Sequence, residues 1–154
     1  MAMIEVRRAR AGDEAALVEL RVEMFRSMDI PTDDHLWRAN AFAWFESRLD
    51  EPAYGIFVVT DGEAVVASAM GCVRDAAPSP TSPNGGDVLV SNVCTAPEHR
   101  GRGHGRAAFE AVMAWARAQG VGRAELMATE AGRGMYERAG FEARSAPLMR
   151  VRLG

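Results

Sequence analysis

The sequence predicts one layered α/β (α+β) domain over residues 1–154, with a mixed and mostly antiparallel sheet. Two observations predict it. Short stretches of strand type and longer stretches with apolar residues three to four positions apart follow one another in the order β-α-α-β-β-β-α-β-α-β. A chain of 154 residues also buries roughly 70% of its unfolded surface, which is enough for a full hydrophobic core. Neither a repeat nor a linker interrupts this order.

The first half of the chain predicts one strand, two amphipathic helices and three further strands. The expected ranges are 4–9, 13–28, 33–49, 54–60, 63–73 and 87–95. Asp13 is expected to be the N-cap of the first helix. Asp61-Gly62 is typical of a hairpin turn between the second and third strands. Residues 75–86 contain three prolines and two glycines and therefore predict an irregular surface loop.

The second half predicts a helix, a strand, a short helix and a terminal strand. The expected ranges are 104–119, 125–128, 132–139 and 148–153. Gly120-Val121-Gly122 ends the first of these helices, and Gly140 ends the second. The strand–helix–strand unit formed around residues 87–128 is what makes the predicted sheet mixed.

Charge and composition exclude several classes of function. All 18 basic residues are arginine, so Schiff-base chemistry and a P-loop lysine are impossible. Residues 1–99 contain 8 arginines against 16 acidic residues, whereas residues 100–154 contain 10 against 5. With a net charge of −3, a nucleic-acid partner is not expected, but a local site for a small polyanion in the last third is.

Membrane, export and metal signals are not readable in the sequence. No apolar run approaches the ~18 residues of a spanning helix, so no membrane partner is expected. The first residues show no apolar stretch before a cleavage site, which favours a cytoplasmic protein. The two cysteines, Cys72 and Cys94, and the three histidines are too scattered to predict a metal site.

The stretch most informative about chemistry joins the strand 87–95 to the helix 104–119. After Pro97, arginines and glycines alternate from Arg100 to Arg106 and lead directly into the helix. The first turn of a helix has N–H groups without partners and a partial positive charge, and glycines let a phosphate approach the backbone. The pattern favours an anion-binding loop; the alternative is a tight turn whose glycines serve packing alone.

A dinucleotide-binding motif is the competing interpretation of this loop. Gly103-x-Gly105-x-x-Ala108 satisfies the fingerprint, and Glu125 lies at about the right distance. That motif follows the first strand of a large parallel sheet, and only about 50 residues remain here, which are too few to build it. We therefore reject the dinucleotide interpretation.

Two motifs together resemble the GCN5-related N-acetyltransferases (GNAT). Arg100-x-x-Gly103-x-Gly105 is similar to the acyl-CoA signature of that family, Arg/Gln-x-x-Gly-x-Gly/Ala. The run from Gly134 to Phe141 is similar to its late helix, in which a tyrosine precedes a Gly-Phe pair. The resemblance implies a GNAT-type sheet of six to seven strands flanked by about four helices. It also implies acetyl-CoA as co-substrate, with no metal.

The resemblance assigns roles to the matched positions at the cofactor. Backbone groups of Val93, Cys94 and Thr95 would pair with the pantetheine arm of acetyl-CoA. Backbone N–H groups of the loop would hold the pyrophosphate, with Arg100 shaping it; the loop residues are Arg100, Gly101, Arg102, Gly103, His104, Gly105 and Arg106. Thr129 stands where many relatives have asparagine, so its contact to the CoA arm comes from a hydroxyl or is absent.

The resemblance also assigns the catalytic groups. Tyr136 would protonate the departing thiolate, with a plain core residue as the alternative. The N–H of Cys94, at a strand bulge, would stabilise the developing oxyanion. An acyl-cysteine on Cys94 is not expected, because no His or Asp partner is readable. A general base is not assignable, since the strand carries no carboxylate after Asp87.

The expected function is transfer of an acetyl group from acetyl-CoA to an amine of a small molecule or peptide, directly in a ternary complex. The alternative is a catalytically inactive CoA-binding sensor or partner module. A homodimer is possible. Acids at Asp29, Asp33, Asp34 and Glu46 lie among the aromatic residues Trp37, Phe42, Trp44 and Phe45, which predicts a cationic acceptor. A solvated helix face over an ordinary aromatic core explains the same residues.

Overall fold

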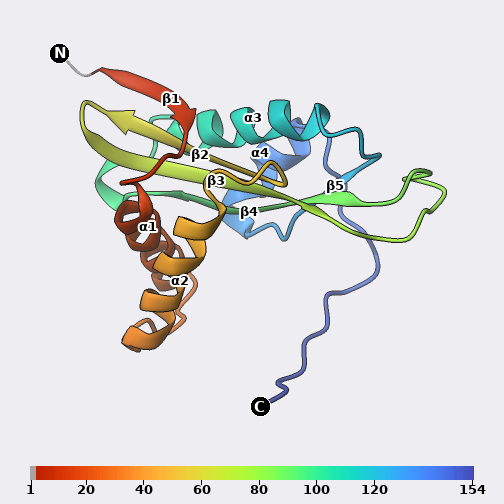
Figure 1. Cartoon of the computed structure of the whole chain (residues 1–154), viewed down its shortest axis with the longest axis horizontal. Helices are drawn as coiled ribbons and strands as arrows, with labels where there is room; N and C mark the ends of the chain where they lie inside the picture. The colour runs from red at the N-terminus through yellow and green to blue at the C-terminus, as the bar shows by residue number, and fades with distance from the viewer. Residues whose placement is uncertain (1–2) are drawn as a thin grey trace.

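The computed structural model describes residues 3–154 and shows a sheet with helices on both faces (Figure 1). The five strands of the described part lie in the order β1 (Ile4–Arg8), β2 (Tyr54–Asp61), β3 (Ala64–Arg74), β4 (Asp87–Thr95) and β5 (Ala124–Glu125). The helices are α1 (Glu14–Ser27), α2 (His35–Arg48), α3 (His104–Arg117) and α4 (Glu130–Arg138), with a 3-10 turn at Pro97–His99. All pairings are antiparallel except that of β4 with β5. The predicted layered class is therefore confirmed.

The sheet separates two hydrophobic cores. On one face, Leu17 and Phe45 bring α1 and α2 against Ile56 and Met70 of the strands. On the other face, α3 and α4 cover the sheet; the buried side chains there include Val59, Ala69, Val88, Val90, Phe109, Val112 and Tyr136. Burial of both strand faces explains why β2 and β3 have nearly continuous apolar sequences rather than strict alternation. Of the helices described here, none is long and apolar enough to cross a membrane.

An extra residue in β4 shifts its register against β3. Ser68 pairs with Cys94, whereas Met70 pairs with Ser91, so β4 has one residue more than β3 over this interval. Asn92 lies within it and has a φ of 57°, in the left-handed region that asparagine tolerates better than most residues. The bulge expected near Cys94 is therefore present. A bulge of this kind changes the face to which the following side chains point.

The contact between β4 and β5 is much shorter than the sequence predicts. Only Val88–Ala124 and Leu89–Glu125 are paired, although a strand was expected over 125–128. Asp87 holds this contact together, since its carboxylate accepts two hydrogen bonds from Arg74 (2.7 and 2.8 Å) and one from Arg123 (3.5 Å). Hydrogen bonding from Arg74 lowers the pKa of Asp87, so the pair is charged at neutral pH. Beyond Leu89, β4 therefore runs on without a neighbouring strand on that side in the described residues.

The predicted terminal strand is wrong. Residues 148–153 belong to no helix or strand, and the tail extends away from the rest of the chain (Figure 1). Its apolar side chains Leu148, Met149, Val151 and Leu153 are 65–94% exposed. The described sheet consequently has five strands rather than six to seven. Apolar–polar alternation indicates strand propensity but does not specify which strand will pair with the segment.

Two glycines on neighbouring strands form a slot for the indole of Trp115. Gly55 of β2 pairs directly with Gly71 of β3. A Cβ atom added at Gly55 would lie 2.3 Å from the Trp115 ring, and one added at Gly71 would lie 2.6 Å from it. Glycine is required at both positions because the indole ring of Trp115, on α3, rests directly on the backbone of the sheet.

We expect Gly55→Ala to lower the free energy of unfolding by about 1–3 kcal/mol, because the added methyl group overlaps the Trp115 ring. Without this overlap, alanine would be more favourable than glycine in a strand. Urea unfolding measures the change. A double-mutant cycle with Trp115→Ala is the control: the pair should lose clearly less stability than the sum of the single variants. Additive losses would show that the ring does not impose the glycine.

Candidate functional site

The loop between β4 and α3 has the backbone geometry that the predicted anion-binding cradle requires. Gly101 and Gly103 have φ values of 78° and 81°, and no atom lies within 4 Å of a Cβ added at either. Glycine is needed there for the left-handed backbone, and the space above it is open. Gly105 has a different reason: its Cβ would lie 2.9 Å from Oγ1 of Thr95, so it lets α3 begin close to the end of β4.

Free hydrogen-bond donors and positive charge meet at this loop. The first hydrogen bond of α3 runs from the N–H of Ala107 to the carbonyl of Gly103 (3.0 Å), which leaves the preceding N–H groups of that turn without an intrahelical partner. Arg106 pairs with Glu110 (2.9 Å). Arg100 and Arg102 are exposed and have no carboxylate partner among residues 3–154. The arrangement suits a phosphate group at the helix N-terminus.

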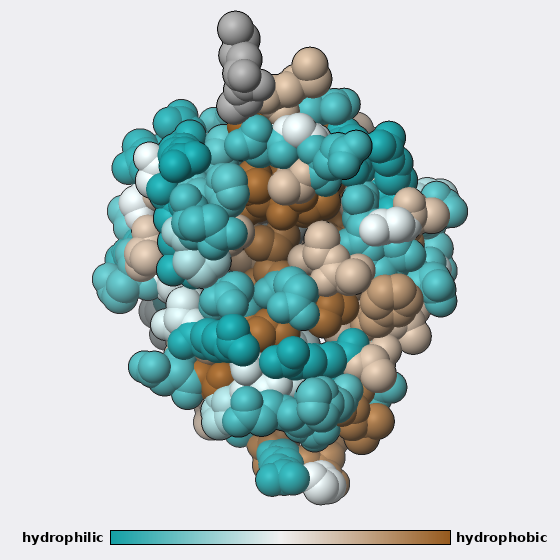
Figure 2. Space-filling view, turned by 90° about the vertical axis from the view of Figure 1, so that its left-hand side faces the viewer, coloured by the Kyte–Doolittle hydropathy of each residue, from teal (hydrophilic) through white to brown (hydrophobic). Residues whose placement is uncertain are grey.

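The cradle continues directly from an open strand edge. Val93, Cys94 and Thr95 lie at the end of β4, beyond the two residues that pair with β5. On that side, no strand within residues 3–154 reaches them. An extended ligand chain can therefore hydrogen-bond to β4 as an added strand and place an attached phosphate in the cradle. Figure 2 views the end of the molecule where β4 finishes; it is mostly hydrophilic, with a hollow of hydrophobic residues at its centre.

Tyr136 projects from α4 into the core beneath α3. It is 8% exposed, and its ring lies 5.2 Å from that of Phe109 and 6.3 Å from that of Phe141. Burial raises the pKa of Tyr136, and the proximity of Cys94 adds to the effect. The hydroxyl therefore carries its proton at neutral pH and is suited to donating it.

Cys94 is buried as a protonated thiol. Its Sγ lies 3.3 Å from Oγ of Ser68 and 3.4 Å from the carbonyl oxygen of Asn92. Burial raises the pKa of Cys94 to about 11, so the nucleophilic thiolate is scarce at neutral pH. Cys94 pairs with Ser68 of β3, and the N–H of Ala96 two residues later donates to the carbonyl of Val66 (2.8 Å). The N–H of Cys94, expected to stabilise the oxyanion, therefore points toward β3 rather than toward the open edge.

A polar cluster that the sequence did not reveal lies on the α1 side of the bulge. Nη1 of Arg21 donates to Oδ1 of Asn92 (3.0 Å), and Nδ2 of Asn92 donates to Oγ of Ser68 (3.4 Å). Arg21 was missed because an arginine on an amphipathic helix carries no signal of its own. Asn92 and Ser68 were missed because their contact depends on the pairing of β3 with β4, which the sequence of one strand does not specify.

Thr129 is the N-cap of α4. Its Oγ1 accepts a hydrogen bond from the N–H of Gly132 (3.3 Å). The hydroxyl proton remains available for a second partner, so a role at the cofactor and the capping role are compatible.

The family model of the acetyltransferase (GNAT) family matches residues 15–141. The chain belongs to this family. No curated protein matches it in sequence. Among solved structures, it resembles a predicted acetyltransferase with acetyl-CoA from Clostridium acetobutylicum, with a TM-score of 0.86 and 21% identity over 97% of this chain and 96% of the other. It also resembles a GCN5-related N-acetyltransferase from Ralstonia eutropha JMP134, with a TM-score of 0.80 and 27% identity over 97% and 99%. A third similar structure is glucosamine-6-phosphate N-acetyltransferase from Arabidopsis thaliana, with a TM-score of 0.76 and 16% identity over 97% of this chain and 98% of the other.

Within this GNAT fold, two of the acidic and aromatic residues near α2, Asp34 and Trp44, have structural partners. Oδ1 of Asp34 accepts from the N–H of Leu36 (2.8 Å) and caps α2. The guanidinium of Arg48 lies 4.6 Å from the ring of Trp44 and 5.7 Å from that of Tyr54, so a cation already covers these faces. Both observations favour the solvated helix face over the cation site that the sequence suggested.

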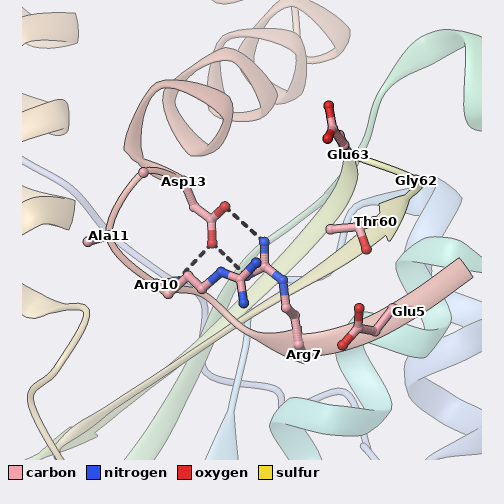
Figure 3. Close-up of a pocket in the computed structure, with 9 residues that line it drawn as sticks. Glu5, Arg7, Arg10, Ala11, Asp13, Thr60, Gly62 and Glu63 are labelled. Carbon is pink, nitrogen blue, oxygen red and sulfur yellow. Dashed lines mark hydrogen bonds and ion pairs between the residues drawn. The ribbon is translucent and has the colours of Figure 1, made fainter.

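A separate hollow beside β1 contains none of the predicted site residues (Figure 3). Arg7 donates two hydrogen bonds to Asp13 there (2.7 and 3.1 Å), and the N–H of Arg10 donates a third (2.8 Å). Burial alone would raise the pKa of Asp13, but these hydrogen bonds hold it below its usual value. Asp13 is the N-cap residue of α1 as expected, yet its side chain binds these partners rather than α1 itself. The charges of Arg7 and Asp13 therefore neutralise each other.

We expect Gly103→Val to abolish CoA binding, because a β-branched residue both strains the left-handed backbone and fills the space above the cradle. Gly120→Val is the matched control, since Gly120 has a φ of 74° and similarly open surroundings but ends α3 at its far side. Calorimetric titration with CoA should show loss of binding in the first variant and unchanged affinity in the second. A folded Gly103→Val protein with normal CoA affinity would contradict the cradle.

Proposed function

We propose that residues 1–154 act as one domain that transfers an acetyl group from acetyl-CoA to an amine of a small molecule or peptide. The observation that carries this proposal is the continuity of the open β4 edge at Val93–Thr95 with the glycine cradle at the start of α3. In CoA, the pantetheine arm is followed by the pyrophosphate, just as the open β4 edge is followed by the glycine cradle. The acetyl-CoA solved with the relative from Clostridium acetobutylicum supports this co-substrate.

In the proposed reaction, the amine nitrogen attacks the thioester carbonyl carbon directly. The new C–N bond forms, negative charge develops on the carbonyl oxygen, and a backbone N–H on the open edge of β4 stabilises it. The C–S bond then breaks, and Tyr136 gives its proton to the leaving sulfur. The attacking nitrogen releases a proton to water. Holding both reactants at the end of β4 supplies the proximity on which direct transfer depends.

A CoA-binding module without catalysis is the other candidate. It is favoured by the absence of a carboxylate on β4 beyond Asp87 to serve as a base. Tyr136 favours the enzyme, because a buried protonated hydroxyl beside the reaction centre is a proton donor that mere binding does not need. Release of free thiol from acetyl-CoA in the presence of a panel of amines distinguishes them: an enzyme gives turnover, whereas a module binds CoA without it.

We expect Tyr136→Phe to lower kcat by about 100-fold with CoA affinity nearly intact, because the ring packing is kept and only the proton donor is lost. The raised pKa keeps the donor protonated to a higher pH than in free tyrosine. As the pH rises, wild-type turnover should therefore fall only above the ordinary pKa range of tyrosine. The turnover of the variant should not show this fall. Normal turnover of the variant at every pH would assign Tyr136 to packing alone.

We expect Cys94→Ser to retain kcat within about threefold, since the protonated thiol takes no part in the proposed transfer. Mass spectrometry after mixing wild-type protein with acetyl-CoA should find no acetyl group on Cys94. An acetylated Cys94 peptide that disappears when an amine is added would instead support a covalent route.

A further inference from the structure

Arg21 is a half-buried cation that no carboxylate neutralises within residues 3–154. Its Nη1 donates to Oδ1 of Asn92 (3.0 Å), and its guanidinium lies 4.8 Å from the ring of Phe25. Burial lowers the pKa of Arg21, and no Asp or Glu opposes that effect. Arginine stays charged even so. A partly desolvated charge is costly unless an opposite charge lies close to it.

Two other half-buried arginines, Arg7 and Arg74, are paired with carboxylates, whereas Arg38 binds the carbonyl of Thr32 and Arg48 stacks on Trp44. Arg7 lies 2.7 Å from Asp13, and Arg74 lies 2.7 Å from Asp87. In both pairs the carboxylate raises the pKa of the arginine. Arg21 is instead fixed by the neutral side chain of Asn92, which leaves Nε and Nη2 without a protein acceptor in the described residues. Its guanidinium is therefore held in place with two donors free.

The position of Arg21 relates it to the reaction centre. It binds Asn92, which is two residues from Cys94 along β4, and the side chains of both residues face α1 beside Ser68. Two residues of a strand span about 7 Å. An anionic group held by Arg21 would thus lie only a few atoms from an amine that attacks at the end of β4.

We propose that Arg21 binds a carboxylate of the acceptor, which makes the acceptors amino acids or similar amines with a carboxylate a few atoms from the nitrogen. This inference rests on the proposed acetyl transfer. Two donors on a planar guanidinium match the two oxygens of a carboxylate, and one positive charge matches its single negative charge. This site would select acceptors with a negatively charged group, whereas the acidic residues near α2 suggested a cationic acceptor.

The test compares acceptors that differ only in the carboxylate. Amino acids with small, aliphatic, aromatic and basic side chains are each paired with the corresponding amide, and thiol release gives kcat/KM. We expect the wild-type protein to prefer the acids by at least about tenfold. Arg21→Gln should lose about 10–100-fold on the acids and stay within about threefold on the amides. Arg48→Gln, which removes a guanidinium stacked 4.6 Å from Trp44, is the matched control and should keep the preference.

A preference for the amides, no preference, or an equal loss on both classes in Arg21→Gln would overturn the proposal. Should Arg21→Gln fail to fold, Arg21→Lys keeps the charge without the planar fork and should show a smaller loss, again confined to the acids. If acetyl-CoA binds but no amine is acetylated, the proposed function fails instead. Calorimetric titration of CoA-loaded protein with N-acetylglycine and N-acetylglycinamide then decides the carboxylate site: tighter binding of the acid that Arg21→Gln abolishes supports it, and equal binding overturns it.

Discussion

The extra residue in β4 at Asn92 is the constraint on which the candidate site depends. Before it, Val88 and Val90 point toward α3; after it, Val93 packs on that face, while Asn92 and Cys94 face α1 and contact Ser68. A regular strand would place Asn92 on the same face as Val90, because side chains alternate. The register shift therefore moves a buried polar side chain to the α1 face, where Arg21 reaches it. One inserted residue thereby separates a hydrophobic face from a polar one.

The other requirement is the early separation of β4 from β5. Because the ladder stops at Leu89–Glu125, the last residues of β4 keep hydrogen-bonding groups that a longer β5 would occupy. Asp87 and its arginine partners fix the point where the strands still touch. A binding edge and a stable sheet can thus coexist in one strand, with the ion pairs at one end and the open edge at the other.

The sequence was informative where a residue type has a single physical use. Alternating glycines at a helix start predicted the cradle, and the left-handed φ values of Gly101 and Gly103 agree with that reason. Prediction failed where the outcome depends on a distant partner. Residues 148–153 alternate like a strand but pair with no described strand, and Asp34, expected to attract a cation, caps a helix. Arg21 could not be found at all, because its significance comes from Asn92, 71 positions away.

The slot formed by Gly55 and Gly71 has an evolutionary consequence. Three positions from separate parts of the chain meet at one contact, so a homologue that gains a side chain at either glycine must also reduce the residue at Trp115. These positions should therefore covary across related sequences, although none of them touches a ligand in the proposed mechanism. The glycine cradle lies at the first turn of α3. The contact of Trp115 with Gly55 and Gly71 therefore also limits how far α3 can move along the sheet. A packing contact about three turns away along α3 thus limits how far the glycine loop at the start of that helix can move relative to β4.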